Sequence, residues 1–133
     1  MAHILLIDDN RDNRNVTELI LVDAGHTVVS AGDGIRGVQI AICVNPDLIL
    51  MDLCLPVLDG WEATRRLKAT TTTCHIPVIA FTAQVDDESL ARAHAAGCVA
   101  VIAKPFDLDA LLAAIARVLR QPPPTDYPQG ISA

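Results

Sequence analysis

Three aspartates of this 133-residue chain stand directly after short apolar runs or at the end of one. Asp8 and Asp9 follow residues 4–7 (ILLI), and Asp52 ends residues 48–52 (LILMD). Carboxylates that share a cleft repel one another, and a divalent cation relieves the repulsion. Such oxygen ligands suit Mg²⁺, which proteins commonly bind through one or two carboxylates together with phosphate oxygens. The three residues therefore indicate a Mg²⁺-dependent site for phosphoryl transfer, in which Asp52 is the nucleophile and forms an acyl phosphate.

Two further side chains complete the chemistry that such a transfer needs. Thr82 follows the apolar run at residues 76–81, and Lys104 follows the run at residues 98–103. Lysine is a compact positive charge that pairs with phosphoryl oxygens, and a threonine hydroxyl donates a hydrogen bond to another oxygen. Phosphoryl transfer depends mostly on positioning and electrostatics, which these groups supply. Each residue alone is explained as well by a helix cap, a strand end or a solvated lysine, whereas the ordered set favours a reactive site.

The rest of the chain has the pattern of elements that would bring these residues together. Short apolar runs alternate five times with stretches of helical periodicity. This alternation predicts a parallel sheet with helices on both faces, and right-handed crossovers place the carboxyl end of every strand at the same edge. We therefore expect one α/β domain, a doubly wound (βα)5 sandwich. The expected strands are residues 4–7, 27–31, 48–52, 76–81 and 98–103, and the expected helices are about residues 10–24, 35–44, 60–68, 87–96 and 108–120.

Capping and stop residues support these boundaries. Asp59, and either Asp86 or Asp87, are expected to cap the helices that follow them. Gly25 and Gly97 fit the left-handed position that ends a helix.

Composition excludes several classes of function. The net charge is −6 and the sequence pI is about 4.9, so binding to a nucleic-acid backbone, which needs a basic face, is not expected. No apolar run approaches the roughly 20 residues of a membrane helix, and the early Asp8 and Asp9 argue against a signal peptide. We expect a cytoplasmic protein that binds neither nucleic acid nor a membrane.

The four cysteines and four histidines give no sign of a disulfide framework or a metal cluster. No two cysteines form a CxxC pair, so buried reduced thiols are expected. The proline-rich residues 121–133 are expected to be a disordered tail or a linker, which leaves residues 1–120 as one domain. No output domain fits after residue 120, so we expect a stand-alone regulator or a domain taken from a longer protein.

The chain resembles the receiver domain of bacterial two-component response regulators. The resemblance covers about residues 3–120 and rests on strand-end motifs in a characteristic order, which are Asp8-Asp9, Asp52, Thr82-Ala83 and Lys104-Pro105. It implies the flavodoxin-like strand order 2-1-3-4-5, in which the first and third strands are neighbours and Asp9 lies near Asp52. It also implies a signalling domain, not an enzyme, that catalyses only its own phosphorylation and dephosphorylation.

The resemblance further implies how the acidic residues act. Asp52 would be the phosphoacceptor, charged by a sensor histidine kinase or a histidine phosphotransfer protein. Asp9, Asp52 and the backbone carbonyl of Cys54 would bind Mg²⁺. Asp8 would bind the metal directly or through water. Phosphorylation would then change the surface that a downstream protein binds.

The same resemblance gives roles to Thr82 and Lys104. Thr82 would be the switch hydroxyl that moves toward the phosphoryl group, and Lys104 would pair with its oxygens. Family members often have an aromatic residue three positions before this lysine, where this chain has Val101. That departure concerns how the signal spreads and not phosphorylation itself. Cys54, two residues after the acceptor, flanks the site and would influence how fast water removes the phosphoryl group.

Three other functions are alternatives. A phosphatase of the haloacid dehalogenase type would use the same groups, but it needs a second aspartate where this chain has Cys54. A flavin-binding domain of similar fold would need phosphate-cradling glycines or hydroxyls where this chain has aspartates. A receiver-like module that binds partners without being phosphorylated is opposed by the intact set of acidic residues.

Overall fold

Five parallel strands form one sheet in the order β2-β1-β3-β4-β5, and a helix follows each strand. The computed structural model describes residues 2–83, 86–104 and 107–120. The predicted fold class and strand order are confirmed. The strands are β1 (His3–Ile7), β2 (Thr27–Ala31), β3 (Leu48–Asp52), β4 (Val78–Thr82) and β5 (Ala100–Ala103), and the helices are α1 (Arg11–Asp23), α2 (Gly34–Val44), α3 (Gly60–Ala69), α4 (Asp87–Ala96) and α5 (Leu108–Arg120).

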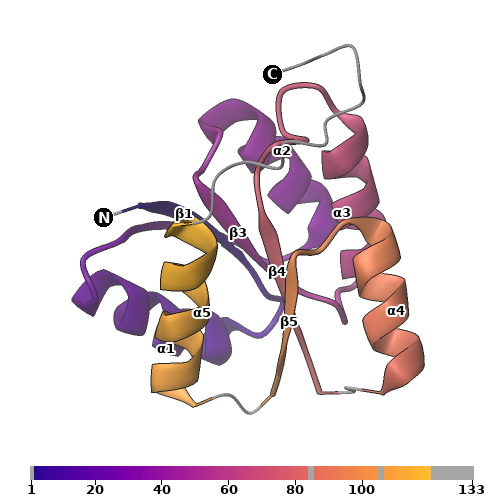
Figure 1. The fold of residues 1–133 in the computed structure, drawn as a ribbon. Coiled ribbons are helices and arrows are strands. Elements are labelled where there is room, and N and C mark those ends of the chain that lie inside the picture. Colours follow the sequence, from indigo (N-terminus) through magenta and orange to yellow (C-terminus); the bar gives the residue numbers. More distant parts are fainter. Residues whose placement is uncertain (1, 84–85, 105–106, 121–133) are drawn as a thin grey trace.

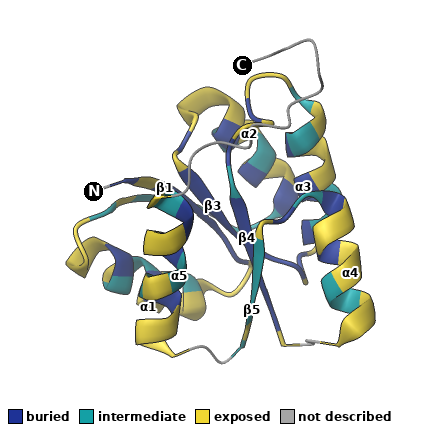
Figure 2. Ribbon diagram, in the orientation of Figure 1, coloured by how far each residue is buried: buried dark blue, intermediate teal, exposed yellow. Residues whose placement is uncertain are grey.

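Helices cover both faces of the sheet, with α1 and α5 on one side and α2, α3 and α4 on the other (Figure 1). On the first face, Leu6 and Leu50 of the sheet share a core with Leu21 of α1 and Ile115 of α5. Strands β3 and β4 are buried along their whole length (Figure 2). Because both faces of these strands are covered, their sequences are continuous apolar runs and do not alternate with polar residues.

The strand register decides which residues meet at the carboxyl edge of the sheet. β1 lies between β2 and β3. Asp52 at the end of β3 is opposite Phe81 of β4, and Thr82 is opposite Ala103 of β5. The residues that follow these strands therefore converge on one edge. The strand order changes direction between β1 and β3, which is where open α/β sheets bind their ligands.

Short polar side chains begin these helices, and the predicted caps Asp59 and Asp86 are confirmed. Asn10 caps α1, Asp59 caps α3 and Asp86 caps α4, and each side chain accepts a hydrogen bond from the backbone N–H three residues later. Gly25 and Gly97 have φ angles of 97° and 114°, which confirms both predicted left-handed stops. The caps thus fix the residue at which each of these helices begins, after the loop at the carboxyl edge of the sheet.

Two strands begin two residues later than predicted, β4 at Val78 and β5 at Ala100. The N–H of Ile76 closes a turn of the preceding loop, with a 3.0 Å hydrogen bond. The N–H of Cys98 donates to the carbonyl oxygen of Ala93 in α4, also at 3.0 Å. These apolar residues therefore complete a turn and a helix end before their strands start.

The expected burial of the cysteines is wrong for three of the four. Cys43, Cys54 and Cys74 are exposed, and Cys98 alone is buried, and all four are free thiols. Cys43 lies on the outer side of α2, while Cys54 and Cys74 lie in loops, where no sheet position enforces burial.

Some predictions concern residues outside the described part of the chain. Pro105 and the proline-rich residues 121–133 are among them. Within the described residues, no helix combines the length and the apolar character that a membrane crossing requires.

Candidate functional site

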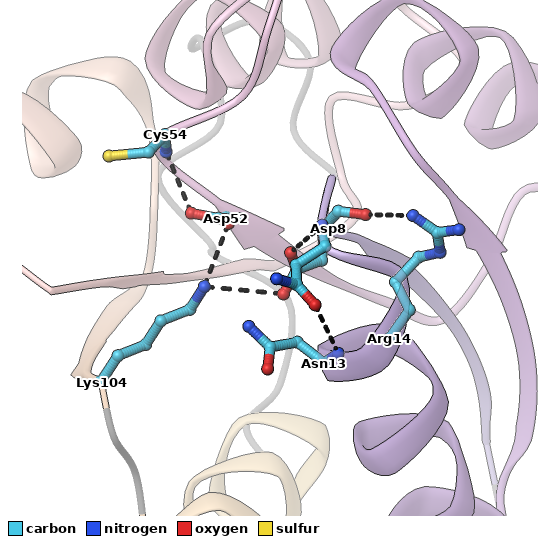
Figure 3. A network of polar contacts seen from close by, with 7 residues as sticks. Asp8, Asn13, Arg14, Asp52, Cys54 and Lys104 are labelled. Carbon is cyan, nitrogen blue, oxygen red and sulfur yellow. Dashed lines mark hydrogen bonds and ion pairs between the residues drawn. The ribbon is translucent and has the colours of Figure 1, made fainter.

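Asp52, the last residue of β3, has its carboxylate between a backbone N–H and a lysine (Figure 3). Its Oδ1 accepts a hydrogen bond from the N–H of Cys54 at 3.0 Å, and its Oδ2 lies 3.0 Å from Nζ of Lys104. The N–H of Lys104 donates to the carbonyl oxygen of Thr82 at 2.8 Å, which continues the β4–β5 pairing past the strand ends. Asp52 is only 4% exposed, so these contacts hold its carboxylate in one orientation.

Asp8 follows β1 and is buried beside Asp52. Its Oδ1 accepts a hydrogen bond from the N–H of Asn10 at 2.9 Å, and its Oδ2 lies 3.5 Å from Nζ of Lys104. Its own N–H donates to the carbonyl oxygen of Ala31 at the end of β2, at 3.1 Å. One ammonium group therefore bridges two carboxylates that come from neighbouring strands.

Asp9 is exposed and completes a group of three carboxylates. One ligand oxygen from each of Asp8, Asp9 and Asp52 lies within 4.8 Å of the other two. Anionic oxygens at this spacing suit a hard divalent cation, and the exposed Asp9 leaves one side open to the water molecules that Mg²⁺ retains. The acidic cluster is therefore able to bind a metal ion.

The pKa values of two site residues are raised, which disfavours the charged form of Asp8 and favours the charged form of Lys104. Burial raises the pKa of Asp8, and the charge of Asp52 adds to the rise, while the Asn10 N–H and Lys104 oppose it. For Lys104, burial is the largest single influence and lowers the pKa. The hydrogen bond to Asp52 and the charges of Asp52 and Asp8 together outweigh it, so the pKa of Lys104 rises. Lys104 therefore stays protonated beside two carboxylates that repel each other.

The other predicted site residues lie along the same edge. Thr82 is buried at the end of β4, and the small Ala83 that follows it is exposed. The backbone of Cys54 faces Asp52, while the residue as a whole is exposed. Val101 is half-buried and packs against the core that α2, α3 and α4 cover.

Two contacts of the site are missed by sequence reasoning. Nζ of Lys104 lies 4.9 Å from the centroid of the Phe81 ring, which adds a cation–π contact to its ion pairs. The Arg14 guanidinium donates to the carbonyl oxygen of Asp8 at 2.8 Å (Figure 3). The position of Arg14, one helical turn after the Asn10 cap, is a usable signal, because helical side chains lean toward the helix N-terminus.

Asp8→Asn is expected to stabilise the metal-free protein at about pH 7 by roughly 1–2 kcal/mol, because it removes a buried charge while Lys104 keeps Asp52 as partner. The raised pKa of Asp8 means that the folded state holds this proton more tightly than the unfolded state. The penalty on folding is therefore full above the folded pKa and fades as the pH falls through it toward the ordinary value of 3.8.

Urea unfolding in EDTA at about pH 7 and pH 4 measures this difference. The advantage of Asp8→Asn should shrink at the lower pH, and the exposed Asp12→Asn should show no such advantage. An advantage of equal size at both pH values would contradict the assigned charge repulsion.

Residues 4–116 match the family described as the response regulator receiver domain. The chain belongs to this family. Receiver domains are signalling domains of two-component systems and are phosphorylated by histidine kinases. The predicted family and the predicted class of function are therefore confirmed.

Curated relatives of this receiver domain differ in length. PilH of Pseudomonas aeruginosa is 35% identical over 119 residues, which cover 90% of this chain and 98% of that protein. The DNA-binding transcriptional regulator RpaA of Synechocystis is 36% identical over 121 residues, which cover 91% of this chain. The chain spans about half the length of several such relatives, with 50% of RpaA and 56% of the response regulator ArlR of Staphylococcus epidermidis.

Solved receiver structures have the same fold. The receiver domain of the sensor histidine kinase PA1611 of Pseudomonas aeruginosa is 37% identical, with a TM-score of 0.85 over 90% of this chain and 98% of that one. That structure has a magnesium ion coordinated in its active-site cleft. The chemotaxis protein CheY4 of Vibrio cholerae also has a TM-score of 0.85, at 29% identity over 89% of this chain and 98% of that one.

Proposed function

We propose that this receiver domain accepts a phosphoryl group on Asp52 from a phosphohistidine of a sensor histidine kinase or a histidine phosphotransfer protein. A carboxylate oxygen of Asp52 attacks phosphorus, the P–N bond of the phosphohistidine breaks, and its electron pair returns to the imidazole nitrogen. The single observation that carries this proposal is the placement of the buried Asp52 carboxylate 3.0 Å from Lys104 and within an acidic cluster that can bind a metal.

The proposed metal is Mg²⁺, and its ligands would be Asp9, Asp52 and the backbone carbonyl of Cys54, with Asp8 binding directly or through water. When bound, Mg²⁺ would neutralise charge on the phosphoryl oxygens. The three anionic oxygen donors and the open side at Asp9 support this choice over a softer metal.

The remaining site residues orient the acceptor and then hold the product. The N–H of Cys54 fixes one oxygen of Asp52, which leaves the other to Lys104. After transfer, the ammonium of Lys104 pairs with phosphoryl oxygens, and the hydroxyl of Thr82 donates to another oxygen and so couples phosphorylation to a change at the surface. Such a change would alter the binding of a downstream protein.

The proposal extends to the organisation and setting of the chain. Residues 1–120 would form the receiver domain, and the proline-rich residues 121–133 would serve as a tail or linker. The four free cysteines suit a reducing compartment, which supports a cytoplasmic location. No separate enzymatic activity is proposed beyond the protein's own phosphorylation and dephosphorylation.

Incubation with acetyl phosphate tests the proposal without knowledge of the kinase. With Mg²⁺, the intact mass of the protein should rise by one phosphoryl group, and EDTA should prevent the rise. Hydroxylamine should remove the added mass, because it cleaves acyl phosphates. Turnover of small phosphate esters would favour the phosphatase alternative, and no mass gain with Mg²⁺ would favour a module that acts by binding alone.

A further inference from the structure

The carbonyl oxygen of Asp8 receives its hydrogen bond from a side chain and not from a strand. β1 ends at Ile7, so the Asp8 carbonyl lies beyond the ladder that joins β1 to its neighbours. Nη1 of Arg14, on the first turns of α1, donates to this oxygen at 2.8 Å. Asp8 is 2% exposed, and a polar backbone group at such a position needs a partner. Arg14 takes the place that a strand N–H would have.

This hydrogen bond fixes the peptide plane that joins Asp8 to Asp9. The plane contains the carbonyl of Asp8 together with the nitrogen and Cα of Asp9. Its orientation therefore sets the direction in which the Asp9 side chain leaves the backbone. Within the described part of the chain, no hydrogen bond or ion pair holds the exposed carboxylate of Asp9 itself, so its direction depends on its backbone.

The guanidinium group is itself held by its surroundings. A Cβ atom added to Gly32, which follows β2, would lie 3.2 Å from Nη1 of Arg14. Arg14 thus lies between the loop after β2 and the loop after β1, while its backbone N–H is bonded to the carbonyl oxygen of Asn10 at 2.9 Å. These contacts leave the half-buried Arg14 side chain fewer alternative rotamers than a solvated arginine has.

We infer that Arg14 is a positioning residue for the metal site, which holds the Asp8-Asp9 turn so that the Asp9 carboxylate faces Asp8 and Asp52. The inference rests on the proposed function, because it concerns the metal proposed there. It also predicts the sign of an effect. A nearby positive charge repels a bound cation, so removing Arg14 would tighten metal binding if only its charge mattered. If Arg14 positions Asp9, its removal weakens metal binding instead.

Mn²⁺, which takes the same oxygen ligands as Mg²⁺, is the probe, and its free concentration is read by electron paramagnetic resonance with the metal-free protein. Arg14→Ala should raise the Mn²⁺ Kd about tenfold, a typical cost of losing a group that orients a ligand. Arg14→Lys should restore most of the affinity, because one N–H donor is enough for the Asp8 carbonyl. The exposed Arg11→Ala removes the same charge from the same helix turn and should leave the Kd unchanged or lower it.

A double-mutant cycle shows whether Arg14 acts through Asp9. In an Asp9→Asn background, Arg14→Ala should change the Mn²⁺ Kd less than about twofold, whereas independent effects would multiply. An unchanged or lower Kd for Arg14→Ala in the otherwise native chain would overturn the inference, and so would a full additional effect in the Asp9→Asn background. Thermal unfolding of each variant without metal ensures that every Kd is measured on folded protein.

The proposed function is read out separately, by the mass gain from acetyl phosphate. If the native protein gains no phosphoryl group but loses Mn²⁺ affinity on Arg14→Ala, the proposed function is wrong and this inference is supported. If the native protein is phosphorylated but has the same Mn²⁺ affinity as Arg14→Ala, the proposed function is supported and this inference is wrong.

Discussion

Asp52→Asn should abolish the mass gain from acetyl phosphate and Mg²⁺, the largest effect expected for any single substitution in this chain. An amide oxygen is a poor nucleophile and cannot form a stable acyl phosphate, so the loss is complete and not partial. The amide oxygen of the variant still accepts a hydrogen bond from the N–H of Cys54, and Lys104 keeps Asp8 as an ion-pair partner, so the fold should be retained. The measurement is intact mass after incubation, with the melting temperature recorded for both proteins.

Asp12→Asn is the matched control for that substitution. Asp12 is also an aspartate near the carboxyl edge, but it is exposed on the first turn of α1 and lies outside the acidic cluster. It should keep the full mass gain. If Asp52→Asn still gained a phosphoryl group, another side chain would be the acceptor, and reduction of the acyl phosphate with borohydride followed by peptide mapping would locate it.

Lys104→Met should lower the rate of phosphorylation by acetyl phosphate about a hundredfold, an effect of the size found when a group that stabilises transition-state charge is removed. Methionine keeps an unbranched apolar side chain beside the Phe81 ring, so the packing there is largely preserved. Mn²⁺ affinity should be unchanged or higher, because Nζ of Lys104 lies 3.0 Å from an Asp52 oxygen and competes with a metal for that carboxylate. The phosphorylation rate should thus fall while the Mn²⁺ affinity does not.

Lys68→Met separates this effect from a general loss of stability. Lys68 is also half-buried, and its Nζ donates to the carbonyl oxygens of Cys74 and Ile76, near the amino end of β4 and far from the site edge. Its replacement should lower the melting temperature and leave the phosphorylation rate unchanged. A similar rate in the native chain and Lys104→Met would show that Lys104 has no part in transfer and serves only to balance the carboxylates.

The rate loss expected for Lys104→Met has an electrostatic basis in the ion pairs of Lys104. In the resting protein, the ammonium of Lys104 is shared by Asp52 and Asp8 at 3.0 and 3.5 Å. The raised pKa of Lys104 keeps it charged throughout the physiological pH range. A cation would therefore already be in place beside a phosphoryl group on Asp52. The same cation reduces the repulsion between the two buried carboxylates before any donor arrives.

Most of the local structure follows from the sequence alone. The apolar runs of β3 and β4, the Asp59 cap and the Gly25 and Gly97 stops depend on covalent neighbours and on burial, which leave a clear pattern in the sequence. Alternation of strands and helices with right-handed crossovers then requires the strand ends to meet at one edge. For these reasons the convergence of Asp8, Asp9 and Asp52 on one edge of the sheet is predictable without a structure, whereas their close approach depends on the order of the strands.

The neighbour relations within that edge were decided by the tertiary structure. Periodicity does not specify that β1 lies between β2 and β3, and the resemblance to receiver domains supplied this order before the structure confirmed it. The contact of Lys104 with the Phe81 ring and the exposure of Cys54 had no counterpart in the pattern. The position of Arg14 indicated only that its side chain leans toward the start of α1, and not that it binds the Asp8 carbonyl. Long side chains and loop residues have many accessible conformations, and only packing between distant segments selects one of them.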